Sequence, residues 1–98
     1  MEPGGLSKTQ PATPEIQHIV DQVKAEYERR ENRTFDIFQA IVYRDQLVAG
    51  TNYFIKVQIS DTSYAHLRVF QALPQEKQGP NLESYQIDKT RDDPVTPF

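Results

Sequence analysis

The clearest hydrophobic pattern in the chain is a stripe with helical spacing that follows a proline. Apolar side chains recur every three or four residues, so they share one face of an α-helix: Ile16, Ile19, Val20, Val23 and Tyr27. Thr13, just before the stripe, can cap free backbone N–H groups, and Pro14 suits the first helical position. The pattern therefore predicts one helix of about 18 residues that begins at Pro14.

Beyond residue 34 the chain changes to the composition and alternation of β-strands. Runs rich in β-branched and aromatic residues cover residues 35–47, 53–59, 64–70 and 85–87. The links at 48–50 and 60–63 are short, and a longer one covers 73–81. Short links close antiparallel hairpins, because parallel strands need a long crossover. The sequence predicts an α+β domain whose antiparallel sheet covers the apolar stripe of the helix.

The two ends of the chain have a different character from its middle. Residues 1–12 contain several prolines and glycines and few apolar residues, which predicts a mobile N-terminal arm without regular structure. The last seven residues include Pro94 and Pro97, and we expect a tail that lies on the surface. With no internal repeat and no shift in composition that marks a boundary, residues 1–98 are expected to form a single domain.

Charge and hydropathy exclude several classes of partner. The formal net charge is −3 at pH 7 and the isoelectric point is near 5.3, which argues against binding to phosphate backbones. There is no basic amphipathic helix that would favour a membrane surface. Although the mean hydropathy is −0.70, the 37% of hydrophobic residues can still form one modest core. We expect neither a nucleic-acid partner nor a membrane partner.

The sequence contains no cysteine. This excludes disulfides, thiolate metal sites and a cysteine nucleophile. Because small secreted domains usually carry disulfides, the absence favours a reducing compartment. Residues 1–10 also lack the apolar run of a signal peptide. We expect a cytoplasmic protein that acts as a monomer.

The reactive side chains do not assemble into a recognisable reaction centre. His18 is expected to face solvent on the helix and His66 lies inside a predicted strand, and neither has a metal-ligand neighbour at a useful spacing. The acidic residues Asp61, Asp92 and Asp93 lie in predicted loops without the pairing that acid–base catalysis needs. We expect no enzymatic activity, no cofactor and no bound metal.

One segment, at residues 46–50, is unusual for a turn. An apolar pair, Leu47 and Val48, is followed by Ala49 and Gly50, whereas turns usually carry polar residues. Two interpretations remain open from the local pattern. Either the turn is exposed and its apolar side chains form a contact surface, or the pair ends a strand and is buried.

This segment, Gln46-Leu47-Val48-Ala49-Gly50, resembles the Gln-Val-Val-Ala-Gly hairpin of the cystatin superfamily. The glycine-containing start of the chain, Leu73-Pro74 in a later hairpin and Tyr85-Gln86-Ile87 near the end resemble the same family, in the same order. The absence of cysteine makes the chain similar to the stefins, or type 1 cystatins, rather than to the secreted members. Leu47 replaces the usual valine and Gln75 stands where glycine is common, and both changes can alter which protease is preferred.

The resemblance implies a cystatin-like α+β fold, with an antiparallel sheet wrapped around one long helix. It also implies reversible, tight-binding, competitive inhibition of papain-like cysteine proteases, the cathepsins, by a wedge of three pieces that occludes the active-site cleft. The pieces are the N-terminal arm and two hairpin loops. The residues expected to bind the protease are Pro3, Gly4, Gly5, Gln46, Leu47, Val48, Ala49, Gly50, Leu73 and Pro74.

A second interpretation belongs to a different class of protein. Glutamines in presumed loops, such as Gln10, Gln75 and Gln78, together with exposed lysines could serve as tie points of a structural, cross-linked protein. Inhibition of active papain distinguishes the two, because a purely structural protein would leave the protease active.

Overall fold

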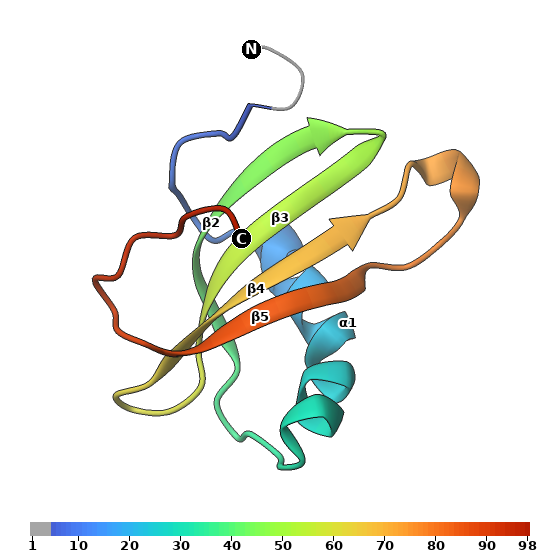
Figure 1. Ribbon diagram of the computed structural model, residues 1–98. Coiled ribbons are helices and arrows are strands. Elements are labelled where there is room, and N and C mark those ends of the chain that lie inside the picture. Colours follow the sequence, from blue (N-terminus) through green and yellow to red (C-terminus); the bar gives the residue numbers. More distant parts are fainter. Residues whose placement is uncertain (1–4) are drawn as a thin grey trace.

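An antiparallel sheet of five strands packs against one long helix in the computed structural model, which describes residues 5–98 (Figure 1). The strands lie in the sheet in the order in which they occur in the chain. The elements, in sequence order, are β1 (Gln10–Pro11), α1 (Pro14–Glu31), β2 (Gln39–Val48), β3 (Gly50–Gln58), β4 (Tyr64–Gln71), a short 3₁₀ helix (Pro74–Glu76) and β5 (Asn81–Lys89). The predicted α+β architecture is confirmed.

Local hydrogen bonds and backbone conformation determine both ends of helix α1. Thr13 Oγ1 accepts a hydrogen bond from the Ile16 N–H at 3.2 Å, and Pro14 occupies the first turn. At the other end Asn32 adopts a left-handed conformation with φ 57°, and its N–H donates to the Arg29 carbonyl at 3.3 Å. The helix spans 18 residues, so its predicted start and length are both correct.

The core lies between the apolar stripe of α1 and one face of the sheet. Val20, Val23 and Tyr27 are almost completely buried, as are Ile55 and Leu67, which are paired across β3 and β4. Successive strand residues point to opposite faces, so the neighbours of these core residues face away from the helix. Burial of the stripe on this face is the main stabilising contact between helix and sheet.

The boundaries of two strands differ from the prediction. Phe35 and Phe38 were expected to begin the first long strand, but β2 starts at Gln39. Both rings instead turn inward against the Tyr27 ring, with centroids 5.3 Å away in each case. At the other end of the chain, β5 is longer than the predicted 85–87, because its solvent-facing polar residues concealed the alternation.

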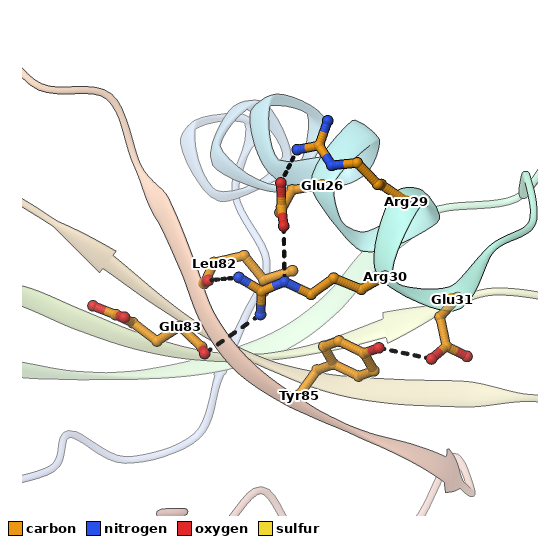
Figure 2. Close-up of polar contacts among 7 residues, drawn as sticks. All are labelled: Glu26, Arg29, Arg30, Glu31, Leu82, Glu83 and Tyr85. Carbon is orange, nitrogen blue, oxygen red and sulfur yellow. Dashed lines mark hydrogen bonds and ion pairs between the residues drawn. The ribbon is translucent and has the colours of Figure 1, made fainter.

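A polar connection ties α1 to the edge strand β5 (Figure 2). The Arg30 guanidinium donates hydrogen bonds to the main-chain carbonyls of Leu82 at 2.8 Å and Glu83 at 3.5 Å. Glu26, one turn earlier, accepts from Arg30 Nε at 2.8 Å and orients the guanidinium. The Tyr85 hydroxyl donates to Glu31 at 2.7 Å on the same side. These contacts fix the end of the helix over the edge of the sheet.

The segment from Leu6 to Pro11 is more ordered than the sequence predicted. We expected residues 1–12 to lack regular structure, but Gln10 and Pro11 form β1 and pair with Tyr43 and Val42 of β2. Further up the chain, Leu6 forms an isolated antiparallel bridge with Gln46. The sequence did not reveal this pairing, because its partners lie more than thirty residues away.

The C-terminal tail covers the face of the sheet opposite the helix (Figure 1). Val95 is only 3% exposed, and the Phe98 ring packs against the Phe54 ring at 5.6 Å between centroids. The buried Lys56 ammonium donates to the main-chain oxygens of Arg91 and Asp93. The tail was expected to lie on the surface, but the structure shows it packed into the protein at Val95.

Candidate functional site

The tip of the β2–β3 hairpin presents apolar side chains to solvent. Val48 pairs with Gly50 across the turn, and Ala49 forms the bend. Leu47 is 56% exposed and Val48 is 45% exposed. Of the two interpretations that the sequence left open, the structure therefore selects the exposed turn. Exposed apolar side chains on a protruding tip are typical of a contact surface.

Gly50 has a structural reason to be glycine. Its φ is +119°, which side chains rarely adopt, and the residue is buried. A Cβ at this position would lie 2.6 Å from the Gln71 carbonyl oxygen and 2.7 Å from the Phe70 ring. Because β3 starts so close to the end of β4, Gly50 contributes to the site through the shape of the turn.

The second loop leaves β4 at the same end of the sheet. Leu73 is 37% exposed, and Pro74 beside it is also exposed. The Leu73 carbonyl accepts a hydrogen bond from the Glu76 N–H at 2.9 Å, and Lys77 completes the turn with φ 53°. Gln75, where the family often has glycine, lies inside the 3₁₀ helix without a positive φ. Its backbone therefore does not require glycine.

The N-terminal arm reaches the same end of the molecule. Pro3 and Gly4, two of the predicted site residues, lie outside the described residues. Gly5 is exposed, and Leu6 forms its bridge with Gln46 at the base of the hairpin tip. The described part of the arm therefore runs beside the first hairpin.

The sheet register brings the arm, the first hairpin and the second loop together at one end of the sheet (Figure 1). Leu6 lies opposite Gln46 on one side of the first hairpin. On the other side, Thr51 pairs with Gln71, the last residue of β4 before the second loop. Across this end of the sheet, the arm therefore lies beside the first hairpin, and the first hairpin lies beside the second loop.

Two buried polar residues that were not expected from the sequence stabilise this end of the sheet. Asn52, 8% exposed, donates from Nδ2 to Gln46 Oε1 at 3.1 Å and braces the hairpin behind its tip. Ser7, 9% exposed, donates its N–H to the Asp45 carbonyl at 2.8 Å and anchors the arm. The register of a tight hairpin could have indicated Asn52. Nothing local indicated Ser7, whose partner lies 38 residues along the chain.

The rest of the described chain offers little for chemistry on a small molecule. His18 is exposed on α1, whereas His66 is 1% exposed in β4 with neither ring nitrogen hydrogen-bonded within residues 5–98. Burial, reinforced by the positive charge of Lys56, lowers the pKa of His66 to about 4. The same described range contains no cluster of three or more side chains able to hold a metal ion.

Three hollows on the described surface lie away from the exposed hairpin tips. Two of them are lined by residues near the C-terminal end of α1 and the β3–β4 turn, among them Arg33, Phe35, Ile59 and Ser60. The arm and the two loops line none of these hollows, and their apolar side chains are exposed, so they are suited to enter a groove in another protein rather than to enclose a ligand. Among the described residues, no helix is both long and apolar enough to cross a membrane.

Comparison with known proteins identifies the family. The cystatin domain model matches residues 4–92. The chain is 51% identical to cystatin-A of Homo sapiens over 98 residues, which covers all of both chains. The chain belongs to the stefin branch of the cystatin family. Its sequence is also 52% identical to leukocyte cysteine proteinase inhibitor 1 of Sus scrofa over 95 residues, covering 97% of this stefin and 92% of that protein.

Cystatin-B of Homo sapiens gives a similar result, with 50% identity over 95 residues and 97% of each chain covered. The family assignment drawn from the ordered motifs of this stefin and its lack of cysteine is therefore confirmed, and so is the cystatin-like fold. The relatives carry the names of cystatins and of a cysteine proteinase inhibitor, and none of these three names is that of an enzyme.

Proposed function

We propose that this stefin is an inhibitor of cysteine proteases of the papain-like class, the cathepsins, and not an enzyme. The family membership and the name of the porcine relative support an inhibitor of cysteine proteases. The observation that carries the finer proposal is the exposure of Leu47 and Val48 at a hairpin tip, beside the second loop and the arm. The proposed action is reversible, tight and competitive, and the protein acts as a cytoplasmic monomer.

The proposed contact is a wedge made of the arm, the 46–50 hairpin and the loop at Leu73 and Pro74. Full burial of Leu47 or Val48 in a protease groove stabilises a complex by roughly 1.5–3 kcal/mol each. Nanomolar affinity needs about 12 kcal/mol net, so the hairpin alone is insufficient. All three segments are therefore needed at once.

The rigidity of the hairpin supports this role. Its strands pair without interruption from Val42 to the turn, and Asn52 braces Gln46, so little conformational freedom is lost on binding. A wedge of turns need not place a peptide bond across the catalytic groups of the protease. Inhibition without cleavage of the inhibitor is the expected result.

The experiment is a titration of active papain with the full chain and with Val48→Asp. The parent should inhibit at a defined stoichiometry, and the substitution should raise the inhibition constant by a factor on the order of one hundred or more, because it places a carboxylate in a dry interface. The matched control is Ile87→Asp, since Ile87 is equally exposed at 45% but lies near the end of β5, away from the hairpin tips. Equal inhibition by parent and Val48→Asp would remove the hairpin from the cleft.

Deletion of residues 1–4 tests the arm separately. We expect weaker inhibition with an unchanged circular dichroism spectrum. An unchanged inhibition constant would show that the arm takes no part. If the parent chain leaves papain fully active, the structural, cross-linked alternative is favoured instead. Gln75 and Gln78 are exposed and available for that role.

A further inference from the structure

Arg44 of β2 links the two ends of the chain. Its Nε donates to the main-chain carbonyl of Ser7 at 2.9 Å, and its Nη1 donates to the main-chain carbonyl of Val95 at 2.8 Å. The guanidinium is planar and its N–H groups have a fixed separation, so two simultaneous bonds determine where both carbonyls lie. One side chain therefore joins the N-terminal arm to the C-terminal tail.

The Val95 carbonyl, which accepts the hydrogen bond from Arg44 Nη1, is firmly held. Val95 is 3% exposed, so its carbonyl is held by packing of its own side chain. The tail is further anchored by Lys56, which donates to the Asp93 carbonyl at 2.6 Å, and by Arg68, which donates to the Phe98 main-chain oxygen at 3.1 Å. The tail thus provides a firm support for one half of the Arg44 guanidinium.

Ser7, whose carbonyl accepts the hydrogen bond from Arg44 Nε, is the residue at which the arm leaves the sheet. Ser7 also exchanges hydrogen bonds with Asp45: its N–H donates to the Asp45 carbonyl at 2.8 Å, and its Oγ accepts from the Asp45 N–H at 2.9 Å. Leu6 then bridges to Gln46, and Gly5 is exposed. Any shift of Ser7 would move the start of the segment that precedes it.

We propose that Arg44 is a positioning residue for inhibition: braced by the tail, it fixes the position of Ser7, the residue at which the N-terminal arm leaves the sheet. The proposal rests on the proposed function, because it assigns a role to the arm in binding. Arg44 itself contacts the arm and the tail and acts on the protease only through the arm. Loss of this contact leaves Ser7 held only by Asp45 and by Gln10, whose Nε2 donates to Ser7 Oγ at 3.1 Å, so Ser7 is placed less firmly and the complex dissociates faster.

The test is a double-mutant cycle that combines Arg44→Gln with deletion of residues 1–4, measured as inhibition and dissociation rate constants on papain. In the full chain, Arg44→Gln should weaken inhibition on the order of tenfold, mainly by faster dissociation. In the chain that lacks residues 1–4, it should change inhibition less than about twofold, because the part of the arm expected to bind the protease is gone. An equal effect in both backgrounds overturns the proposal, since a general loss of structure would be felt with or without the arm.

Two further variants separate the arm contact from its neighbours. Arg44→Lys keeps the charge but lacks the planar fork, so it should remain weaker than the parent; full parental inhibition would overturn the two-carbonyl geometry. Arg68→Gln removes an arginine contact at Phe98, the end of the tail, and leaves in place the buried Val95 side chain and the Lys56 contact that hold the tail beside Arg44. It should inhibit like the parent, and a loss equal to that of Arg44→Gln would overturn the role of the arm contact.

A measurement without protease distinguishes this proposal from the proposed function. Hydrogen exchange at the Ser7 and Asp45 amides should accelerate in Arg44→Gln and stay unchanged in Arg68→Gln, while circular dichroism remains that of the parent. Unchanged exchange at both amides in Arg44→Gln overturns the positioning role. Failure of the parent to inhibit papain, with the exchange result as expected, would overturn the proposed function and the inhibitory role of Arg44 with it.

Discussion

Gly50 is a residue at which one additional carbon atom would change the hairpin. The space for that atom is already occupied by the Gln71 carbonyl, 2.6 Å from the position of a Cβ, and by the Phe70 ring. The backbone also has φ +119°, where a side chain adds strain. Glycine at this position of the hairpin motif therefore allows β3 to lie close to β4.

Gly50→Ala is expected to lower the free energy of unfolding by about 2–4 kcal/mol, since the clash and the backbone strain add. It should also weaken inhibition of papain, because the tip that carries Val48 must move. Gly79→Ala is the matched control: a Cβ there meets only Gln22 Oε1 at 3.8 Å, and its stability should change by less than about 0.5 kcal/mol. Urea denaturation measures both, and equal stabilities for the two variants would refute the steric argument.

His66 is the residue that connects stability to pH. Its folded pKa is about 4 against an ordinary value of 6.5, because burial disfavours the charged ring and Lys56 repels it. The unfolded state therefore binds a proton more readily between these two values. The free energy of unfolding should be unaffected above pH 6.5, fall as the pH drops from 6.5 to 4, and lose about 2–3 kcal/mol in total.

His66→Leu should remove this part of the pH dependence, because leucine has no proton to bind and needs no hydrogen-bond partner in the buried site. Denaturation curves at pH 7, 6, 5 and 4 measure it. His18→Gln is the comparison variant, since it removes a histidine that is exposed on α1 and not part of the core. A slope that persists in His66→Leu would assign the acid sensitivity to other groups.

At the scale of elements, the edge strand β5 is the part of the fold most open to another chain. An edge strand presents unpaired backbone groups that can pair with a second copy. Arg30 covers part of this strand by donating to the carbonyls of Leu82 and Glu83 (Figure 2). Asp88, near the end of the strand, has φ 60° and interrupts its regular geometry. Both features oppose the addition of another strand.

Arg30→Met should lower stability by about 1 kcal/mol, because a partly exposed charge-assisted contact is lost, and should increase self-association. Light scattering coupled to size exclusion, together with hydrogen exchange in β5, measures the effect. Arg29→Met provides the comparison, since Arg29 pairs with Glu26 in the same turn but is not among the residues bonded to β5. Similar association of the two variants would show that the edge needs no protection from Arg30.

At the scale of the whole molecule, the sheet is covered on both faces, by α1 on one and by the C-terminal tail on the other (Figure 1). The tail is held by cations from three adjacent strands, Arg44, Lys56 and Arg68, which donate to its main-chain oxygens. Lys56 is only 3% exposed, and burial lowers its pKa. Without the tail this buried ammonium group would lose its acceptors.

Removal of residues 91–98 should lower the free energy of unfolding by about 3 kcal/mol or more, because Val95 is lost from its site and Lys56 is left unpaired. Denaturation of the shortened chain measures it. Adding Lys56→Met to the shortened chain should restore part of the loss, whereas the same substitution in the full chain should destabilise it. A substitution that acts alike in both backgrounds would contradict this role of the tail carbonyls.

The sequence by itself determined the elements whose causes are local. The Thr13 cap and the apolar stripe were enough for α1, and short links with alternating residues were enough for the antiparallel hairpins. The motif at 46–50, together with Leu73-Pro74, Tyr85-Gln86-Ile87 and the glycine-containing start in the same order, was enough to assign the family. Each of these signals lies within a few residues or one or two turns, where spacing and propensity act directly.

Only the tertiary structure decided the features that depend on distant partners. It decided that Leu47 and Val48 are exposed, that Ser7 docks on Asp45, that Phe35 and Phe38 leave the strand to pack on Tyr27, and that the tail covers the second face. In each case the deciding partner is at least eight residues away in the chain or is a solvent boundary set by the whole sheet. No local pattern records such a partner, because the chain meets it only after the sheet has formed.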